Sequence, residues 1–353
     1  MTSPDLEHSS TPDRPKKRGG PWGILLVFLA LILSGGWYTS YVLSPGPESP
    51  NETAIVSIPR GTSVRGISEI LAREGIINPD VRFLLLAKLS GYSSRLQAGE
   101  FRLRTGIKPL EVLRELASAR SIEYPITIPE GLRAAEIAQI FGDYGWCNPK
   151  SFLNLVNDKA FLAKLGFPHL DSLEGYLYPD TYLFTRDITG AEKIIPIMVK
   201  RFNEVWSEVT AGVPGPVDLE KTVILASIVE KETGTPEERP LIAAVFQNRL
   251  QSGMRLQSDP TVIYGTKKFS APISKSDLLT ETPYNTYTLP GLPVGPICSP
   301  GKDALLAVLH PTPTDTLYFV SKNDGTHHFS KSLIEHNRAV EKYQRKNSDK
   351  KGK

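Results

Sequence analysis

The stretch 222-TVILASIVEKETG-234 decides how the second half of this 353-residue chain folds. Its apolar residues do not alternate with polar ones, which is typical of a helix that is buried on most of its faces. Two acids, Glu230 and Glu232, end the apolar run. A carboxylate at the end of a buried helix must be paired, or its ionisation must be shifted. We therefore expect one of these acids either to stabilise the fold or to do chemistry.

Helix geometry gives the two acids different neighbours. Residues three and four apart adjoin on a helix, so small residues surround Glu230, namely Ala226, Ser227, Thr233 and Gly234. Glu232 lies about 200° further round, next to Ile228 and Val229, so the two acids cannot share one cleft. The pattern favours a single working acid, Glu230, whose pKa burial would raise. The alternative is that Glu230 caps the helix or forms an ion pair.

The segments that follow supply polar groups for a cleft. In 235-TPEERPLIAAVFQNRL-250, a capping Thr235 followed by Pro236 and Glu238 predicts a second helix, which meets the first at Gly234. Amides, hydroxyls and aromatic rings on turns are the groups that bind sugars. We expect a cleft lined by Gln257, Ser258, Asp259, Tyr264, Asn285, Thr286 and Tyr287. Arg249 either orients Glu230 or forms a structural ion pair.

The N-terminal part predicts a membrane anchor. Residues 21–43 form an uncharged apolar run of about the length that a helix needs to cross a bilayer. Aromatic residues lie at both ends of it, and the run lacks the cleavage site of a signal peptide. Four basic residues precede it, so the N-terminus is expected in the cytoplasm and the rest outside the inner membrane; they are Arg14, Lys16, Lys17 and Arg18.

Two stretches resemble each other, 54–72 and 124–142; each reads as a strand, a Pro-x-Gly turn and a helix. In 171-DSLEGYLYPDTYLF-184, the rings belong either to a core or to a substrate platform. The fold class is α+β, with a mainly helical catalytic domain and a small accessory sheet. The expected order is a cytoplasmic tail (1–20), a transmembrane helix (21–43), a linker (44–52), a β-α-α-β module (53–121), an intermediate strand-helix region (122–214), the catalytic domain (215–345) and a basic tail (346–353).

Composition and charge exclude several classes of function. A net charge of +3 comes partly from basic tails and does not indicate nucleic-acid binding. Cys147 and Cys298 are too few for a metal site or a disulfide framework, although one bridge remains open. Four histidines lack convincing ligand spacing, so no metal or cofactor is expected; they are His310, His327, His328 and His336.

Four motifs carry a resemblance to a known family: "LASIVEKET", "NRL-x-x-GMRLQSDPTVIYG", "TPYNTYTLPGLPVGPI-x-SPG" and "YFV-x-x-x-DGTHHFS". Over roughly residues 50 to 345 the chain resembles the MltG (YceG-like) family of membrane-anchored endolytic murein transglycosylases. The resemblance implies that the module 53–121 is LysM-like and that Glu230 is the catalytic acid. It further implies cleavage of the bond from N-acetylmuramic acid to N-acetylglucosamine in peptidoglycan strands without water, leaving 1,6-anhydro ends. Peptidoglycan synthases are the implied partners.

Two other functions remain open. A muramidase that uses water would need Asp259 as a second acid beside Glu230. A glycan-binding scaffold that localises synthases would need no working acid at all. The products released from glycan strands distinguish these three possibilities.

Overall fold

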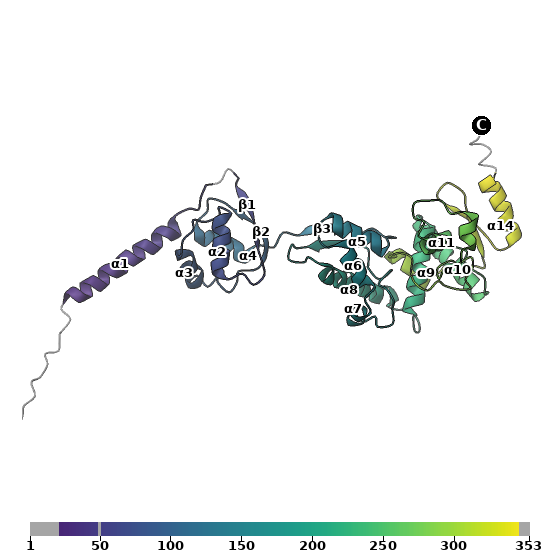
Figure 1. Cartoon of the computed structure of the whole chain (residues 1–353), viewed down its shortest axis with the longest axis horizontal. Coiled ribbons are helices and arrows are strands. Elements are labelled where there is room, and N and C mark those ends of the chain that lie inside the picture. The colour runs from purple at the N-terminus through teal and green to yellow at the C-terminus, as the bar shows by residue number, and fades with distance from the viewer. Residues whose placement is uncertain (1–20, 49–50, 346–353) are drawn as a thin grey trace, which may run out of the picture. The chain divides into compact units, whose positions relative to one another are not determined.

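The computed structural model describes residues 21–48 and 51–345, so the predicted tails 1–20 and 346–353 lie outside the described residues. The chain divides into two compact units between Ile122 and Glu123. Helices dominate both units, and the described residues form three two-stranded antiparallel sheets, which confirms the predicted α+β class (Figure 1). The boundary predicted at 214/215 falls inside the second unit.

The first unit begins with α1 (Pro21–Leu43), which is long and apolar enough to span a membrane, as predicted. The end of this helix is held by Arg82, which donates hydrogen bonds to the Trp37 carbonyl at 2.5 Å and to Ser40 Oγ at 3.0 Å. Within the predicted linker, the Gly46 amide donates to the Ile107 carbonyl at 2.9 Å. The segment directly after α1 is therefore attached to the module that follows.

That module has the predicted strand-helix-helix-strand order. It comprises β1 (Thr53–Ile58), α2 (Val64–Arg73), α3 (Arg82–Leu89), β2 (Gly99–Arg104) and α4 (Pro109–Ser118). The strands are antiparallel, with Thr53 opposite Arg104 and Ile58 opposite Gly99. Alternate strand residues such as Val56 and Phe101 are fully buried, because side chains of a strand point to opposite faces of the sheet.

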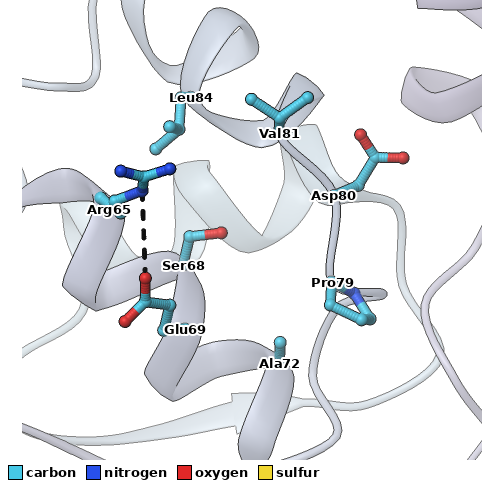
Figure 2. Close-up of a pocket in the computed structure, with 8 residues that line it drawn as sticks. All are labelled: Arg65, Ser68, Glu69, Ala72, Pro79, Asp80, Val81 and Leu84. Atoms are coloured by element: carbon cyan, nitrogen blue, oxygen red, sulfur yellow. Dashed lines mark ion pairs between the residues drawn. The ribbon is translucent and has the colours of Figure 1, made fainter.

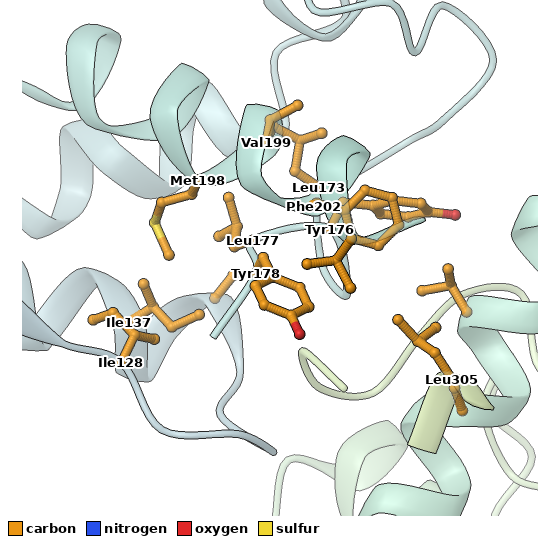
Figure 3. Close-up of a cluster of buried hydrophobic side chains, with 14 of the residues drawn as sticks. Ile128, Ile137, Leu173, Tyr176, Leu177, Tyr178, Met198, Val199, Phe202 and Leu305 are labelled. Carbon is orange, nitrogen blue, oxygen red and sulfur yellow. The ribbon is translucent and has the colours of Figure 1, made fainter. Parts of the chain in front are cut away.

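The second unit opens with a similar arrangement, as the internal similarity predicts. Its elements are β3 (Tyr124–Thr127), α5 (Ala134–Asp143), α6 (Pro149–Val156), α7 (Lys159–Lys164), β4 (Thr181–Phe184) and α8 (Ala191–Thr210). The aromatic stretch before β4 belongs to the core. The Tyr176 and Phe202 rings lie 5.1 Å apart, and Figure 3 shows them in one cluster with Leu305 from the C-terminal part. The core is therefore continuous through this unit.

The C-terminal part is mainly helical, with one hairpin. Its elements are α9 (Leu219–Glu232), the short 3-10 helix η1 (Pro236–Glu238), α10 (Arg239–Gln251), α11 (Asp259–Thr266), α12 (Lys275–Leu279), α13 (Lys302–Leu309), β5 (Tyr318–Ser321), β6 (His327–Ser330), α14 (Leu333–Val340) and the π-helix η2 (Glu341–Arg345). Every residue of α9 from Thr222 to Val229 is buried, as its apolar pattern predicts. Cys147 and Cys298 are both free cysteines.

Candidate active site

The C-terminal end of α9 carries Glu230 and Glu232 out of the core and into two different environments. α9 packs against α10 and α13, so its last turn is enclosed by elements that follow it in the chain. Because the two acids are two residues apart, they point in different directions. They therefore act as two separate sites.

Glu230 belongs to a buried ion-pair network. Its side chain is 6% exposed, and it accepts hydrogen bonds from Arg239 Nη2 at 3.0 Å and from the Gly301 amide at 2.9 Å. The Arg239 side chain is itself 9% exposed, and its guanidinium lies 3.9 Å from Glu130 and 3.6 Å from Asp303. Both carboxylate oxygens of Glu230 are therefore engaged in hydrogen bonds within the protein. The contacts of Glu230 are those of a structural acid.

Glu232 has the environment of a proton donor. It is only partly exposed, and its Oε1 accepts a hydrogen bond from Ser258 Oγ at 2.5 Å. The pKa of Glu232 is raised to about 7, mainly by burial and also by the nearby charge of Asp259, while the hydrogen bond from Ser258 opposes the shift. A carboxyl group that titrates near neutral pH can act as a general acid and then as a base. Among the described residues, none donates a hydrogen bond to its Oε2.

Several of the predicted cleft residues gather around Glu232. Ser258 is its hydrogen-bond partner, and the exposed Asp259 accepts a 2.6 Å hydrogen bond from the Tyr287 hydroxyl. Gln257 is exposed beside them, with a left-handed backbone (φ 52°) that turns the chain into α11. The structure therefore places Ser258, Asp259 and Tyr287 around the second acid, with Gln257 next to them in the chain.

Two other predicted cleft residues, Asn285 and Thr286, are fully buried and cannot touch a substrate. The Asn285 amide donates to the Thr280 carbonyl at 2.7 Å and to other carbonyls of the same loop. Thr286 Oγ1 accepts a hydrogen bond from the Ser258 amide at 2.9 Å. Buried polar groups must find partners within the protein, so these residues hold the loops that carry Ser258 and Tyr287.

Arg249 does not pair with Glu230, and that prediction is wrong. The buried guanidinium of Arg249 donates to the Leu317 and Leu256 carbonyls at 2.7 and 2.6 Å. Its positive charge acts instead on Glu232, whose pKa it lowers. Arg249 is the last charged residue of α10, whereas Arg239, the partner of Glu230, is the first residue of that helix.

Sequence reasoning missed three members of the Glu230 network: Arg239, Glu130 and Gly301. A Cβ on Gly301 would lie 2.0 Å from Glu130 Cδ, so any larger residue at that position would displace the Glu130 carboxylate. Glu130 lies in the turn of the repeated strand-turn-helix pattern, and burial raises its pKa, as does the charge of Glu230. The Pro-x-Gly turn that contains Glu130 can be recognised in the sequence, but no local pattern predicts that this turn contacts the end of α9.

Tyr264, also a predicted cleft residue, lies outside the Glu232 cluster. Its hydroxyl donates to Glu174 Oε2 at 3.0 Å, and its ring lines a cavity of about 290 Å³. The cavity begins one residue from Glu232 along α9 and one residue from Asp259 along α11. Its lining residues are Arg133, Glu136, Lys231, Pro260, Ile263, Tyr264, Phe269 and Ile297.

The first unit contains another cavity, of about 220 Å³ (Figure 2). Arg65 and Glu69 of α2 form an exposed ion pair at 4.0 Å along one wall. Asp80 lies on the opposite wall, where hydrogen bonds from Arg82 lower its pKa. An ionised, paired carboxylate is no proton donor near neutral pH, so the end of α9 remains the candidate active site.

Comparisons with known proteins identify the family of this chain. The model of the YceG-like family matches residues 56–342. A Bacillus subtilis (strain 168) protein named endolytic murein transglycosylase is 34% identical over 329 residues, which cover 89% of this chain and 91% of that protein. A protein of the same name from Streptococcus pneumoniae (strain D39) is 31% identical over 351 residues, and the match covers 89% of this chain but 63% of that longer protein.

A solved structure also matches. The crystal structure of a yceG-like protein from Listeria monocytogenes superposes with a TM-score of 0.56 at 32% sequence identity, covering 82% of this chain and 99% of that one. The family match extends over most of both units, including the whole of α9 and the loops around it. This chain therefore belongs to the YceG-like family.

Proposed function

We propose that this protein is a membrane-anchored lytic transglycosylase that cuts peptidoglycan glycan strands internally, and that Glu232 is its catalytic acid. The relatives named endolytic murein transglycosylase support the reaction class. The observation that carries the site is the raised pKa of Glu232, a carboxyl that lies in a cluster with the polar side chains of Ser258, Asp259 and Tyr287. Glu230, the acid predicted from sequence, is held in an ion pair with Arg239.

One acid is sufficient for this reaction. Protonated Glu232 donates its proton to the glycosidic oxygen as the bond from muramic C1 to that oxygen breaks. The resulting carboxylate then takes the proton of the muramic C6 hydroxyl while O6 forms a bond to C1. The product is a 1,6-anhydro end, and Glu232 is protonated again. Since the nucleophile is part of the substrate, the second step is intramolecular and gains from proximity.

A muramidase is the second candidate, and one observation favours it. The carboxylate of Asp259 lies close enough to Glu232 to raise the pKa of that acid. A pair of carboxyl groups around one bond is the arrangement of glycosidases that use water. Such an enzyme would leave free reducing ends in place of anhydro ends.

The proposal also covers the location of the chain, the module from β1 to β2 and the partners. We expect the N-terminus before α1 to lie in the cytoplasm and the chain after α1 to lie outside the inner membrane, so that the site would be beside newly made strands. The module from β1 to β2 is expected to be LysM-like and to bind glycan. Peptidoglycan synthases are the expected partners, and cutting strands beside them would set glycan length.

Mass spectrometry of the products tests the proposal. The full-length protein in detergent is incubated with uncrosslinked glycan strands, beside a Glu232→Gln variant whose fold is checked by circular dichroism. Anhydro-muramic ends from the wild type alone support the transglycosylase. Reducing ends would establish the muramidase and give Asp259 a direct role. Intact strands from folded wild-type protein would leave the glycan-binding scaffold.

A further inference from the structure

The cavity beside Glu232 carries charges that the cleavage step does not use. Lys231 lies between the two acids on α9, and its Nζ donates to the Gly131 carbonyl at 3.3 Å while the side chain stays exposed. On the facing helix α5, Arg133 Nη2 donates to Glu136 Oε1 at 2.8 Å. Both cations line the same cavity.

The lining has an excess of one positive charge. Although burial opposes it, hydrogen bonding from Arg133 lowers the pKa of Glu136, which therefore stays ionised near neutral pH. Glu136 balances Arg133, and although the charge of Lys231 also acts on Glu136, the hydrogen bond that its ammonium donates within the described residues goes to the Gly131 carbonyl. One anionic group on a ligand would complete the charge balance of the cavity.

The opposite wall is aromatic and held in place. The Tyr264 ring lies edge-on to Phe269, with centroids 6.4 Å apart, and the Tyr264 hydroxyl is fixed by its hydrogen bond to Glu174. Phe269 is in turn covered by the Arg133 guanidinium, whose Cζ lies 3.3 Å from the ring centroid. A rigid apolar wall facing cations suits a ligand that has a non-polar body and a carboxylate.

We propose that this cavity binds the peptide that hangs from N-acetylmuramic acid, with Lys231 taking a peptide carboxylate. The inference rests on the proposed function, because it assumes that a glycan strand lies across Glu232. In such a strand the sugars are uncharged, and carboxylates belong to the peptide attached to muramic acid. The cavity is lined by Lys231 and Pro260, which are next in sequence to Glu232 and Asp259, and we infer that a peptide on a muramic residue close to the cut bond would reach it.

Steady-state kinetics on two substrates test this proposal. The full-length protein and a Lys231→Gln variant are compared on uncrosslinked strands that keep their peptides and on the same strands stripped of peptides by an amidase, with the lactyl carboxylates that the amidase exposes then converted to methyl amides. We expect the variant to raise KM for the peptide-bearing strands about tenfold, the typical effect of losing one charge-assisted hydrogen bond. The kcat on both substrates and the KM for stripped strands should stay unchanged.

A matched control uses the same helix. Lys221 lies at the other end of α9, is exposed and pairs with Asp218 at 3.0 Å, so Lys221→Gln should leave both KM values unchanged. The proposal is overturned if Lys231→Gln changes both substrates equally, changes neither, or is matched by Lys221→Gln. A loss of cleavage on both substrates would reflect disturbance of the neighbouring Glu232 and would also reject a peptide-specific role.

The failure of the proposed function has a different signature. If the wild type cuts neither substrate, calorimetric titration with a soluble disaccharide-tetrapeptide and with the bare disaccharide replaces the kinetics. Tighter binding of the peptide-bearing fragment, lost in Lys231→Gln, would keep the peptide site and reject the transglycosylase. Equal binding of the two fragments would reject the peptide site.

Discussion

Glu230 and Glu232 lie two residues apart on one helix and are the same amino acid, yet their surroundings give them opposite properties. Glu230 accepts hydrogen bonds from a buried guanidinium and from a backbone amide, so both of its oxygens are engaged within the fold. Around Glu232, one serine hydroxyl and a distant arginine do not offset burial and the charge of Asp259, so the pKa rises to about 7. The environment, and not the residue type, decides which carboxyl can deliver a proton.

The largest expected effect comes from Glu232→Gln. Glutamine keeps the shape and still accepts the hydrogen bond from Ser258, but it cannot give up a proton. We expect the rate of strand cleavage to fall roughly 10²–10⁴-fold, the usual contribution of a general acid, without a lower Tm. The measurement is the rate of new ends by liquid chromatography, with Tm by circular dichroism. A nearly normal rate in this variant would return the catalytic role to Glu230.

Glu230→Gln should do the reverse. It leaves the buried Arg239 without its main counter-charge, which costs roughly 3 kcal/mol of unfolding free energy, while cleavage per folded molecule stays within about tenfold of the wild type. Thermal and urea unfolding measure the first effect and the assay of ends measures the second.

Asp303→Asn is the control, because that exposed acid lies 3.6 Å from the same arginine. A surface ion pair contributes little, so this variant should lose less than about 1 kcal/mol. If Glu230→Gln proved as stable as the wild type and inactive, the two environments would have been assigned the wrong way round.

The pH dependence of the wild type sharpens the comparison. Cleavage needs protonated Glu232, so the rate should fall as pH rises through about 7 and then drop about tenfold for each further pH unit. The free energy of unfolding should change with pH in the same direction as the rate. Because the folded pKa is raised, the contribution of this group is present below the unfolded pKa and is lost as pH rises through about 7. Rates and Tm values collected from pH 5 to about 9 test both, and a rate that climbs above pH 8 would contradict them.

The smallest effect should come from Ser258→Ala. The Ser258 hydrogen bond lowers the pKa of Glu232, so its loss should move the alkaline limb of the rate profile to higher pH. We expect the limiting rate to fall by less than about tenfold, since one positioning hydrogen bond is lost and the acid remains. Ser252→Ala, at an exposed serine after α10, should leave the profile in place. A limb that moves to lower pH would mean that Ser258 does not donate to Glu232.

Particular residues show which features of the fold and the site could be predicted from the sequence. The apolar run of α9 predicted a buried helix with acids at its end, and that is confirmed. The similar stretches at 54–72 and 124–142 predicted two strand-turn-helix units, which are seen as β1-α2 and β3-α5. The polar loop residues Ser258, Asp259 and Tyr287, which were predicted to line a cleft at Glu230, gather around Glu232, and Arg249, Asn285 and Thr286 have buried supporting roles.

The helix, its burial and the presence of two acids pointing apart were determined by the sequence alone, because periodicity and residue volume act over a few turns. Which acid is held by an arginine and which has a raised pKa was decided only by the tertiary structure. Glu230 is paired with Arg239 and Gly301, and Glu232 with Ser258, through contacts that span up to 71 residues of chain. Desolvation and Coulomb interactions depend on distance in space, and α9 presents two nearly equivalent carboxylates until the loops after it have packed.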